Sequence, residues 1–227
     1  MAKNGSSAEF FEYLIKHSVE DPENPQLPSL NALSDELGVS VACLREQLGV
    51  AKALGWVEVR PRTGIKHLPY SFYQAVWQSL SYAINIDHKF FETFADLRKQ
   101  VELAYWEEAV RVLTPRDIDD LWNLVEQANV KLQGNPIRIP HSEHRELHLS
   151  IYQRLNNPFV LGILEAYWDA YEAIGLSLFT DLRYLEEVWM YHRKMVEAIC
   201  QGDFDAGFRA LAEHTDLLRH RRDGYQD

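Results

Sequence analysis

The chain has 227 residues, of which 46% are hydrophobic and 25% are charged, which is enough for one large globular domain or two smaller ones. Its formal net charge of -11 at pH 7 argues against a protein that coats nucleic acid non-specifically, and two isolated cysteines, Cys43 and Cys200, give neither a disulfide framework nor a thiolate zinc site. Because no apolar run is long enough to span a membrane and the first residues lack the pattern of a secretory signal, we expect a cytoplasmic protein with no membrane partner.

The first fifty-five residues carry the signals of three short helices. Apolar residues at helical spacing mark the first helix around residues 10–17. A second helix is predicted to begin after Ser29, whose hydroxyl can cap it, and to end at Gly38. A third is predicted to begin after Ser40 and to end at Gly55, which can adopt the left-handed conformation that terminates helices. The second and third helices therefore form a helix-turn-helix pair.

A strand signal follows these helices directly. Residues 56–60 alternate between apolar and charged side chains, residues 61–64 have turn chemistry, and residues 65–68 can pair back as a second strand. A helix-turn-helix followed by a hairpin is the order of a winged helix. We therefore expect a winged helix-turn-helix DNA-binding domain over residues 1–69, with a small β-hairpin as its wing.

Beyond Pro69 the strand signals vanish and apolar residues recur every three to four positions. Several boundaries carry capping chemistry, such as Thr114-Pro115, where a capping hydroxyl precedes a proline in the first turn. Residues 70–227 are therefore expected to form an all-helical bundle, which makes the chain mainly α. The expected helices cover residues 71–84, 88–112, 115–133, 141–156, 158–179, 182–201 and 203–221.

The segment from Ser40 to His67 is basic although the whole chain is acidic. It holds five basic residues and only two acidic ones. Phosphate contacts require positive charge only on the docking surface, so a local basic patch suits sequence-specific binding to duplex DNA. The simpler alternative is a packing domain whose surface happens to be basic.

An ordered set of short motifs gives this segment a family resemblance. Leu27-Pro28-Ser29, Leu33-Ser34, Leu37-Gly38-Val39-Ser40, Leu44-Arg45 and Gly55-Trp56-Val57 resemble the head of the GntR family of transcriptional regulators, over residues 10–68. Arginines that this family usually carries are replaced here by Asn31 and Val41, which reduces direct guanine readout. The resemblance and the basic patch together assign operator DNA contacts to Ser40, Arg45, Arg62, Gly64 and Lys66.

Four of the nine histidines lie where helical spacing turns them inward. His144 and His148 are one turn apart on the same face of their helix, and His192 and His214 each lie on the apolar stripe of a later helix. Neutral imidazoles bind zinc and similar divalent ions, and a cation compensates polar rings that lack other partners in a core. The alternative for each histidine is a hydrogen-bonded core residue.

The same pattern resembles the FCD effector domain of the FadR-like branch of the GntR family. The resemblance implies a bound divalent metal with His148, His192 and His214 as ligands, and it places His144 where the family pattern has an aspartate. A histidine-rich set favours zinc, nickel or cobalt over manganese or magnesium, and we expect zinc or nickel. His141, one turn earlier, is a possible helper, although a capping or surface role suits its place at the start of the helix.

Arg98 is a charged residue on an apolar stripe, where it needs an anionic partner. The FCD resemblance implies that it binds the carboxylate of a small effector beside the metal. The alternative is a structural ion pair with an acid such as Glu102 or one from another helix.

Taken together, the motifs and the resemblance predict a ligand-responsive transcriptional regulator with no catalytic residues, and the family resemblance implies that it is a homodimer. Its partners would be double-stranded operator DNA and a small carboxylate effector, and effector binding would alter operator affinity by linkage between two sites. One rival is a metal-dependent hydrolase or isomerase of small organic acids, since a histidine-bound metal can activate water. The other is a metal-stabilised scaffold with a degenerate DNA-binding head.

Overall fold

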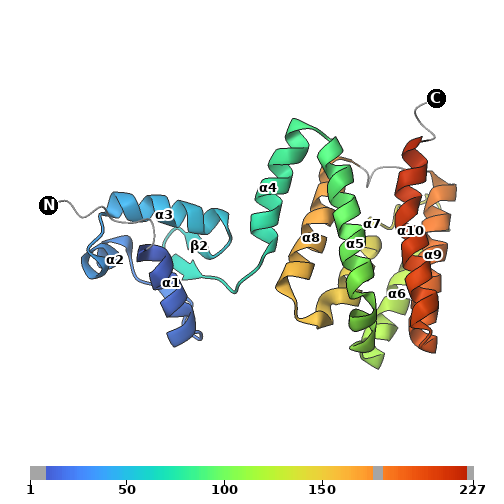
Figure 1. Cartoon of the computed structure of the whole chain (residues 1–227), viewed down its shortest axis with the longest axis horizontal. Helices are drawn as coiled ribbons and strands as arrows, with labels where there is room; N and C mark the ends of the chain where they lie inside the picture. Colours follow the sequence, from blue (N-terminus) through green and yellow to red (C-terminus); the bar gives the residue numbers. More distant parts are fainter. Residues whose placement is uncertain (1–8, 176–180, 224–227) are drawn as a thin grey trace. The chain divides into compact units, whose positions relative to one another are not determined.

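The computed structural model describes residues 9–175 and 181–223. The chain divides into two compact units, one that ends at Ser79 and one that begins at Leu80. The expected fold class is confirmed, because long helices dominate the chain and the strands all belong to one small sheet in the first unit (Figure 1). The expected functional boundary after residue 69 stays a prediction.

The first unit is a winged helix-turn-helix. Ser29 and Ser40 cap their helices as expected, each accepting a hydrogen bond from the backbone N–H three residues later. Gly38 and Gly55 adopt left-handed backbone conformations, with φ of 67° and 74°. The elements are α1 (Glu9–Glu20), β1 (Gln26–Leu27), α2 (Leu30–Leu37), α3 (Val41–Ala53), β2 (Val57–Arg60) and β3 (Gly64–His67).

The wing has three strands where the sequence predicted two. The antiparallel sheet has the order β1-β3-β2, and Gln26 of β1 lies opposite Lys66 of β3. Residues 26–27 are too few to show an alternating pattern, so this strand left no signal of its own. The unit is held by an apolar core that includes Phe10, Leu33, Leu44, Leu48, Val57 and Ile65.

The second unit is an all-helical bundle. Helices α9 and α10 pack along each other, and α9 also packs against α6 while α5 packs against α10 (Figure 1). Helix α4 (Tyr73–Ile86) crosses the boundary between the two units. The other helices are α5 (Lys89–Arg111), α6 (Pro115–Leu132), α7 (His141–Tyr152), the 3-10 turn η1 (Gln153–Leu155), α8 (Pro158–Ala173), α9 (Leu182–Gln201) and α10 (Phe204–Asp223).

Two of the expected helices are shorter than predicted. The helix expected over 141–156 ends at Tyr152 and continues as the 3-10 turn up to Asn156, which adopts a left-handed conformation with φ of 51°. The helix expected over 158–179 ends at Ala173, and residues 176–180 of that prediction lie outside the described residues. The first prediction followed the spacing of Ile151 and Leu155 into the 3-10 turn, and the second followed apolar residues beyond Ala173.

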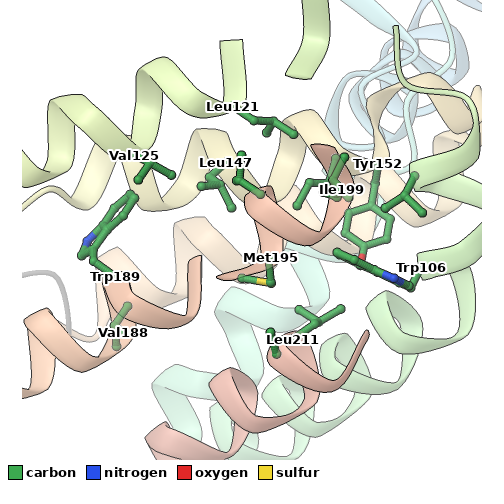
Figure 2. Packing of buried hydrophobic residues seen from close by; sticks show 14 of the residues in the cluster. Trp106, Leu121, Val125, Leu147, Tyr152, Val188, Trp189, Met195, Ile199 and Leu211 are labelled. Carbon is green, nitrogen blue, oxygen red and sulfur yellow. The ribbon is translucent and has the colours of Figure 1, made fainter. Parts of the chain in front are cut away.

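The bundle core is large and aromatic. Figure 2 shows Trp106, Tyr152, Met195 and Leu211 packed together, and each of them is almost completely buried. Full burial of side chains of this size stabilises the fold by about 1.5–3 kcal/mol each. None of the helices in the described ranges is long and apolar enough to cross a membrane.

Candidate metal centre

Three helices of the bundle bring four histidines together in its interior. Helix α7 supplies His144 and His148, α9 supplies His192 and α10 supplies His214. One ring nitrogen from each histidine can serve as a ligand atom, and these four nitrogens all lie within 4.8 Å of one another. The structure thus collects all four histidines that the sequence singled out as inward-facing.

The four rings turn the same atom toward one another. The Nε2 atom of His148 lies 3.2 Å from the Nε2 atoms of both His192 and His214, and the Nε2 atom of His144 lies 3.4 Å from that of His214. Nitrogens arranged tetrahedrally about 2.0–2.1 Å from a zinc ion are about 3.3–3.4 Å apart from one another. The donor type and the spacing therefore both fit a divalent cation.

Hydrogen bonds between the four rings cannot satisfy all of their nitrogen atoms. A neutral imidazole has one N–H and one lone pair, so the Nε2 atom of His148 can accept one strong hydrogen bond but not two. It nevertheless lies equally close to two other Nε2 atoms. The Nδ1 atoms of His192 and His214 are buried and have no hydrogen-bond partner among residues 9–175 and 181–223.

The surroundings keep these imidazoles neutral. Burial, with further contributions from the neighbouring positive groups, lowers the pKa of His144, His192 and His214 well below the ordinary value. Burial lowers the pKa of His148 as well, although Glu102 beside it opposes that shift. Neutral rings are the form that binds metals, so the cluster is prepared for a cation without first losing protons.

Aromatic rings form a wall around the cluster. Trp168 of α8 makes an edge contact with His144, with ring centroids 4.5 Å apart, and Trp189 of α9 lies 4.6 Å from His192. Figure 2 shows Trp189 at one end of the packed core, near Val125. These rings limit the access of water to the histidines, which strengthens electrostatic interactions inside the cluster.

Arg98 lies beside the cluster and is paired with an acid. Its Nε atom is 2.8 Å from Oε2 of Glu102, one turn later on α5, and both side chains are almost completely buried. The N–H direction misses the oxygen, so this contact is an ion pair without an aligned hydrogen bond. The guanidinium also lies over the ring of Tyr167, 4.6 Å from its centroid. The structural ion pair with Glu102 that the sequence left open is therefore present.

Glu102 also contacts the histidine cluster, and sequence reasoning missed this contact. Its Oε1 atom lies 2.9 Å from Nδ1 of His148. Burial raises the pKa of Glu102, but Arg98 and His148 beside it more than offset this, and the pKa is lowered overall. The carboxylate is therefore ionised. Its spacing of four from Arg98 was visible in the sequence, but nothing there placed it beside a helix that begins almost forty residues later.

His141 does not belong to the cluster. Its ring stacks on Tyr171, with centroids 5.7 Å apart and planes at 8°. The four-histidine group that the described residues form does not include it. A supporting place in the aromatic wall therefore describes His141 better than that of a ligand.

The five residues expected to contact DNA lie in the first unit and are exposed. Ser40 caps α3, and Arg45 lies in the second turn of that helix. Arg62 is in the turn between β2 and β3, Gly64 is the first residue of β3, and both have positive φ; Lys66 is also on β3. None of these five residues belongs to the apolar core of the head.

Comparisons with known proteins agree with this architecture. Residues 93–217, more than half of the chain, match the FCD domain family. The chain is 23% identical over 219 residues to the fatty acid metabolism regulator protein of Haemophilus influenzae strain 86-028NP, covering 90% of this chain and 84% of that protein. It is 27% identical over 188 residues to the uncharacterized HTH-type transcriptional regulator YieP of Escherichia coli K12, covering 81% and 80%.

Solved structures show the same fold. Streptococcus agalactiae GntR superposes with a TM-score of 0.70 at 18% identity, covering 95% of this chain and 100% of that one. E. coli McbR/YncC superposes with a TM-score of 0.50 at 21% identity, covering 97% and 98%. The order of a winged head followed by a helical bundle therefore recurs over the full length of these chains.

Proposed function

The chain belongs to the FadR-like, FCD-domain branch of the GntR transcriptional regulators, and from this premise we propose that it binds operator DNA under the control of a metal-dependent effector site. In this proposal His144, His148, His192 and His214 hold a divalent cation in the FCD domain. A small carboxylate then binds beside that cation and Arg98. Its binding changes the affinity of a homodimer for double-stranded operator DNA.

The convergence of four neutral imidazole nitrogens carries the metal part of the proposal. Buried polar groups without partners are rare in folded proteins, and here a cation would use the Nε2 lone pairs of all four rings. Nitrogen donors alone suit zinc, nickel or cobalt, whereas magnesium and manganese prefer oxygen. We therefore propose zinc or nickel as the resident ion. When bound, it would act as a Lewis acid that attracts an anionic group.

Charge balance supports an anionic effector. The four imidazoles are neutral, and the charges of Arg98 and Glu102 cancel. A divalent cation would therefore leave two uncompensated positive charges in a buried site, which is costly unless an anion accompanies it. A small carboxylate on the metal supplies that charge, and Arg98, which lies 2.9 Å from Nδ1 of the ligand His148, is the nearby cation that we propose as its second partner.

The exposed basic residues of the head support the DNA part of the proposal. Arg45 on α3 is presented where a recognition helix meets base edges, and Arg62 and Lys66 lie on the wing. Because Val41 and Asn31 stand where family arginines are usual, we expect fewer guanine contacts than a typical relative makes.

An enzymatic role has less support than a regulatory one. The relatives named above are regulators. A hydrolase would also need a general base beside the metal, and the carboxylate that touches the cluster, Glu102, is already engaged by Arg98 and His148. Turnover assays with hydrolysable and isomerisable organic acids test this rival directly.

The proposal has two separable tests. For the effector site, metal-loaded protein is titrated calorimetrically with a panel of small organic acids, and we expect at least one acid that binds the wild type and binds Arg98→Ala much more weakly. Arg193→Ala, which removes a surface arginine paired with Glu126, is the matched control and should bind normally. Equal binding to the wild type and Arg98→Ala rejects the effector role of Arg98.

For the DNA site, an operator is selected from random duplex DNA with the full-length protein. Failure to enrich any sequence, with or without the organic acid, rejects operator recognition and favours a scaffold with a degenerate head. Where an operator is obtained, the acid must change its affinity, and by reciprocity the operator must change the affinity for the acid by the same factor.

A further inference from the structure

Glu102 is a completely buried carboxylate with two partners on opposite sides. One oxygen faces the guanidinium of Arg98 on its own helix, and the other faces the ring of His148 on α7 at 2.9 Å. The residue is fixed from its backbone as well, because its carbonyl accepts a hydrogen bond of 2.8 Å from the Tyr152 hydroxyl. This carboxylate is therefore held rigidly against one member of the histidine cluster.

The contact with Glu102 determines which nitrogen of His148 carries the proton. An ionised carboxylate only accepts hydrogen bonds, so Nδ1 of His148 must donate to it. The Nη2 atom of Arg98, also 2.9 Å from Nδ1, is a donor too and cannot bond to a protonated Nδ1. The carboxylate attracts the Nδ1 proton, whereas the guanidinium repels it, and both lie 2.9 Å from Nδ1. We assign the proton to Nδ1 because the carboxylate oxygen needs a donor there, whereas the guanidinium is already paired with the other oxygen of Glu102 at 2.8 Å. The Nε2 atom of His148 is then left with its lone pair facing the cluster.

The other buried histidines have no such support. The Nδ1 atoms of His192 and His214 lack hydrogen-bond partners in the described structure, so nothing there selects their tautomer. His148 is also central to the geometry, because its Nε2 atom is 3.2 Å from those of both neighbours. Holding the ring of His148 in one orientation therefore holds its Nε2 atom in place between the Nε2 atoms of His192 and His214.

We propose that Glu102 is a positioning residue for the metal centre, which locks His148 in the Nδ1–H tautomer and directs its Nε2 lone pair at the cation. The inference rests on the proposed metal function. Carboxylates behind metal-bound histidines raise the basicity of the ring and hold its orientation, and their loss typically weakens metal binding by about 10–100-fold. Arg98 has a corresponding part, since its charge favours the ionised form of the buried Glu102.

The first test replaces the carboxylate by an amide of nearly the same shape. Glu102→Gln can turn either its oxygen or its NH2 group toward His148, so it no longer selects one tautomer. We expect the affinity for zinc, measured by competition with a chromogenic chelator, to fall by about 10–100-fold. The matched control is Glu143→Gln, a buried carboxylate on α7 whose partner is Lys131 of α6 at 2.7 Å, and zinc affinity should be unchanged there.

A second readout separates positioning from simple stabilisation and requires no metal. Long-range 1H–15N spectra of metal-free protein report which ring nitrogen carries the proton. We expect a single Nδ1–H form for His148 in the wild type and in Glu143→Gln, and a mixture of tautomers or the Nε2–H form in Glu102→Gln. A loss of stability alone would not change the tautomer that His148 adopts in the folded protein.

The outcomes distinguish this inference from the proposed function. If the wild type binds no divalent metal, the proposed function fails, whereas the tautomer of His148 still tests Glu102. If metal binds and Glu102→Gln keeps both wild-type affinity and the Nδ1–H form, the positioning role is overturned. Should Glu102→Gln fold poorly because Arg98 is left unpaired, the neutral double variant Arg98→Gln/Glu102→Gln replaces it, with the same expected loss of zinc affinity and of the single tautomer.

Discussion

The winged head and the helical bundle bury different kinds of side chain. Among the described residues of the head, Gln47 is the one polar side chain in the core, and it accepts a hydrogen bond from the backbone of Phe10. The bundle buries Arg98, Glu102 and three of the four clustered histidines in addition to its apolar residues. The burial of apolar side chains is enough to explain the core of the head. The ionisable groups of the bundle cost free energy to bury, and the cation and effector proposed above would offset part of that cost.

The largest effect that we expect comes from leaving a charge unpaired in the bundle. Arg98→Met removes the partner of a buried carboxylate, and such changes typically cost about 3–5 kcal/mol in the free energy of unfolding. Urea unfolding of the helical unit measures this cost. The double variant Arg98→Met/Glu102→Gln should recover part of it, because no charge is left alone. A single variant as stable as the wild type would mean that these charges are not energetically coupled.

A comparable but purely apolar loss is expected in the head. Leu33 is completely buried, and Leu33→Ala should destabilise the head by about 2–5 kcal/mol through lost burial and a residual cavity. Operator binding should fall with head stability, while zinc affinity stays at the wild-type value. If Leu33→Ala changed the zinc affinity, the head and the bundle would not be independent in stability and metal binding, which would contradict this comparison.

A smaller effect is expected on the exposed face of the head, where charge matters but burial does not. Arg45→Ala should weaken binding to the selected operator by about 1–3 kcal/mol if the arginine reads a base edge, without altering the unfolding free energy. Mobility-shift titrations at several salt concentrations measure this change. Arg111→Ala, which removes an exposed arginine of the bundle, is the matched control. Unchanged affinity for Arg45→Ala would contradict the assigned role.

The smallest effect is expected at the start of α6. Thr114 and Asp117 form a reciprocal capping box, and Thr114→Ala should lower the free energy of unfolding by about 0.5–2 kcal/mol.

Hydrogen bonds from Arg154 and Thr114 hold the pKa of Asp117 well below its usual range. Because its pKa is lower in the folded state, the ionised Asp117 carboxylate stabilises the fold at pH values above its unfolded-state pKa of about 3.9. This stabilisation is lost as the pH falls toward the folded-state pKa and the carboxylate becomes protonated. Urea unfolding of wild type and Asp117→Asn should therefore differ at pH 7 and converge in strong acid.

Much of the fold could be predicted from the sequence because its signals are local. Ser29, Ser40 and Thr114 cap their helices where their positions before apolar runs indicated. The short strand β1 could not be predicted, since residues 26–27 pair with β3 only through the tertiary fold. Helix α7 was extended too far because Leu155 keeps helical spacing from Ile151 within a 3-10 turn, and α8 because apolar residues follow its last residue, Ala173.

The candidate site was predictable to the extent that its members depart from an apolar pattern. The clustered histidines and Arg98 each interrupt an apolar stripe, and a charged or polar residue at such a position signals a partner inside the core. The identity of the partner is a property of the tertiary fold. Glu102 was therefore recognised as a possible partner of Arg98, four residues away, but not as the partner of His148 on another helix.

The most direct measurement for the central claim is the X-ray absorption spectrum of the zinc-loaded full-length protein, compared with His148→Ala. Histidine ligation predicts a shell of nitrogen scatterers at about 2.0–2.1 Å with the outer-shell signature of imidazole rings, and fewer imidazoles or no bound zinc in the variant. A shell of oxygen atoms alone, or the same spectrum from both proteins, would contradict a metal centre built on these four histidines.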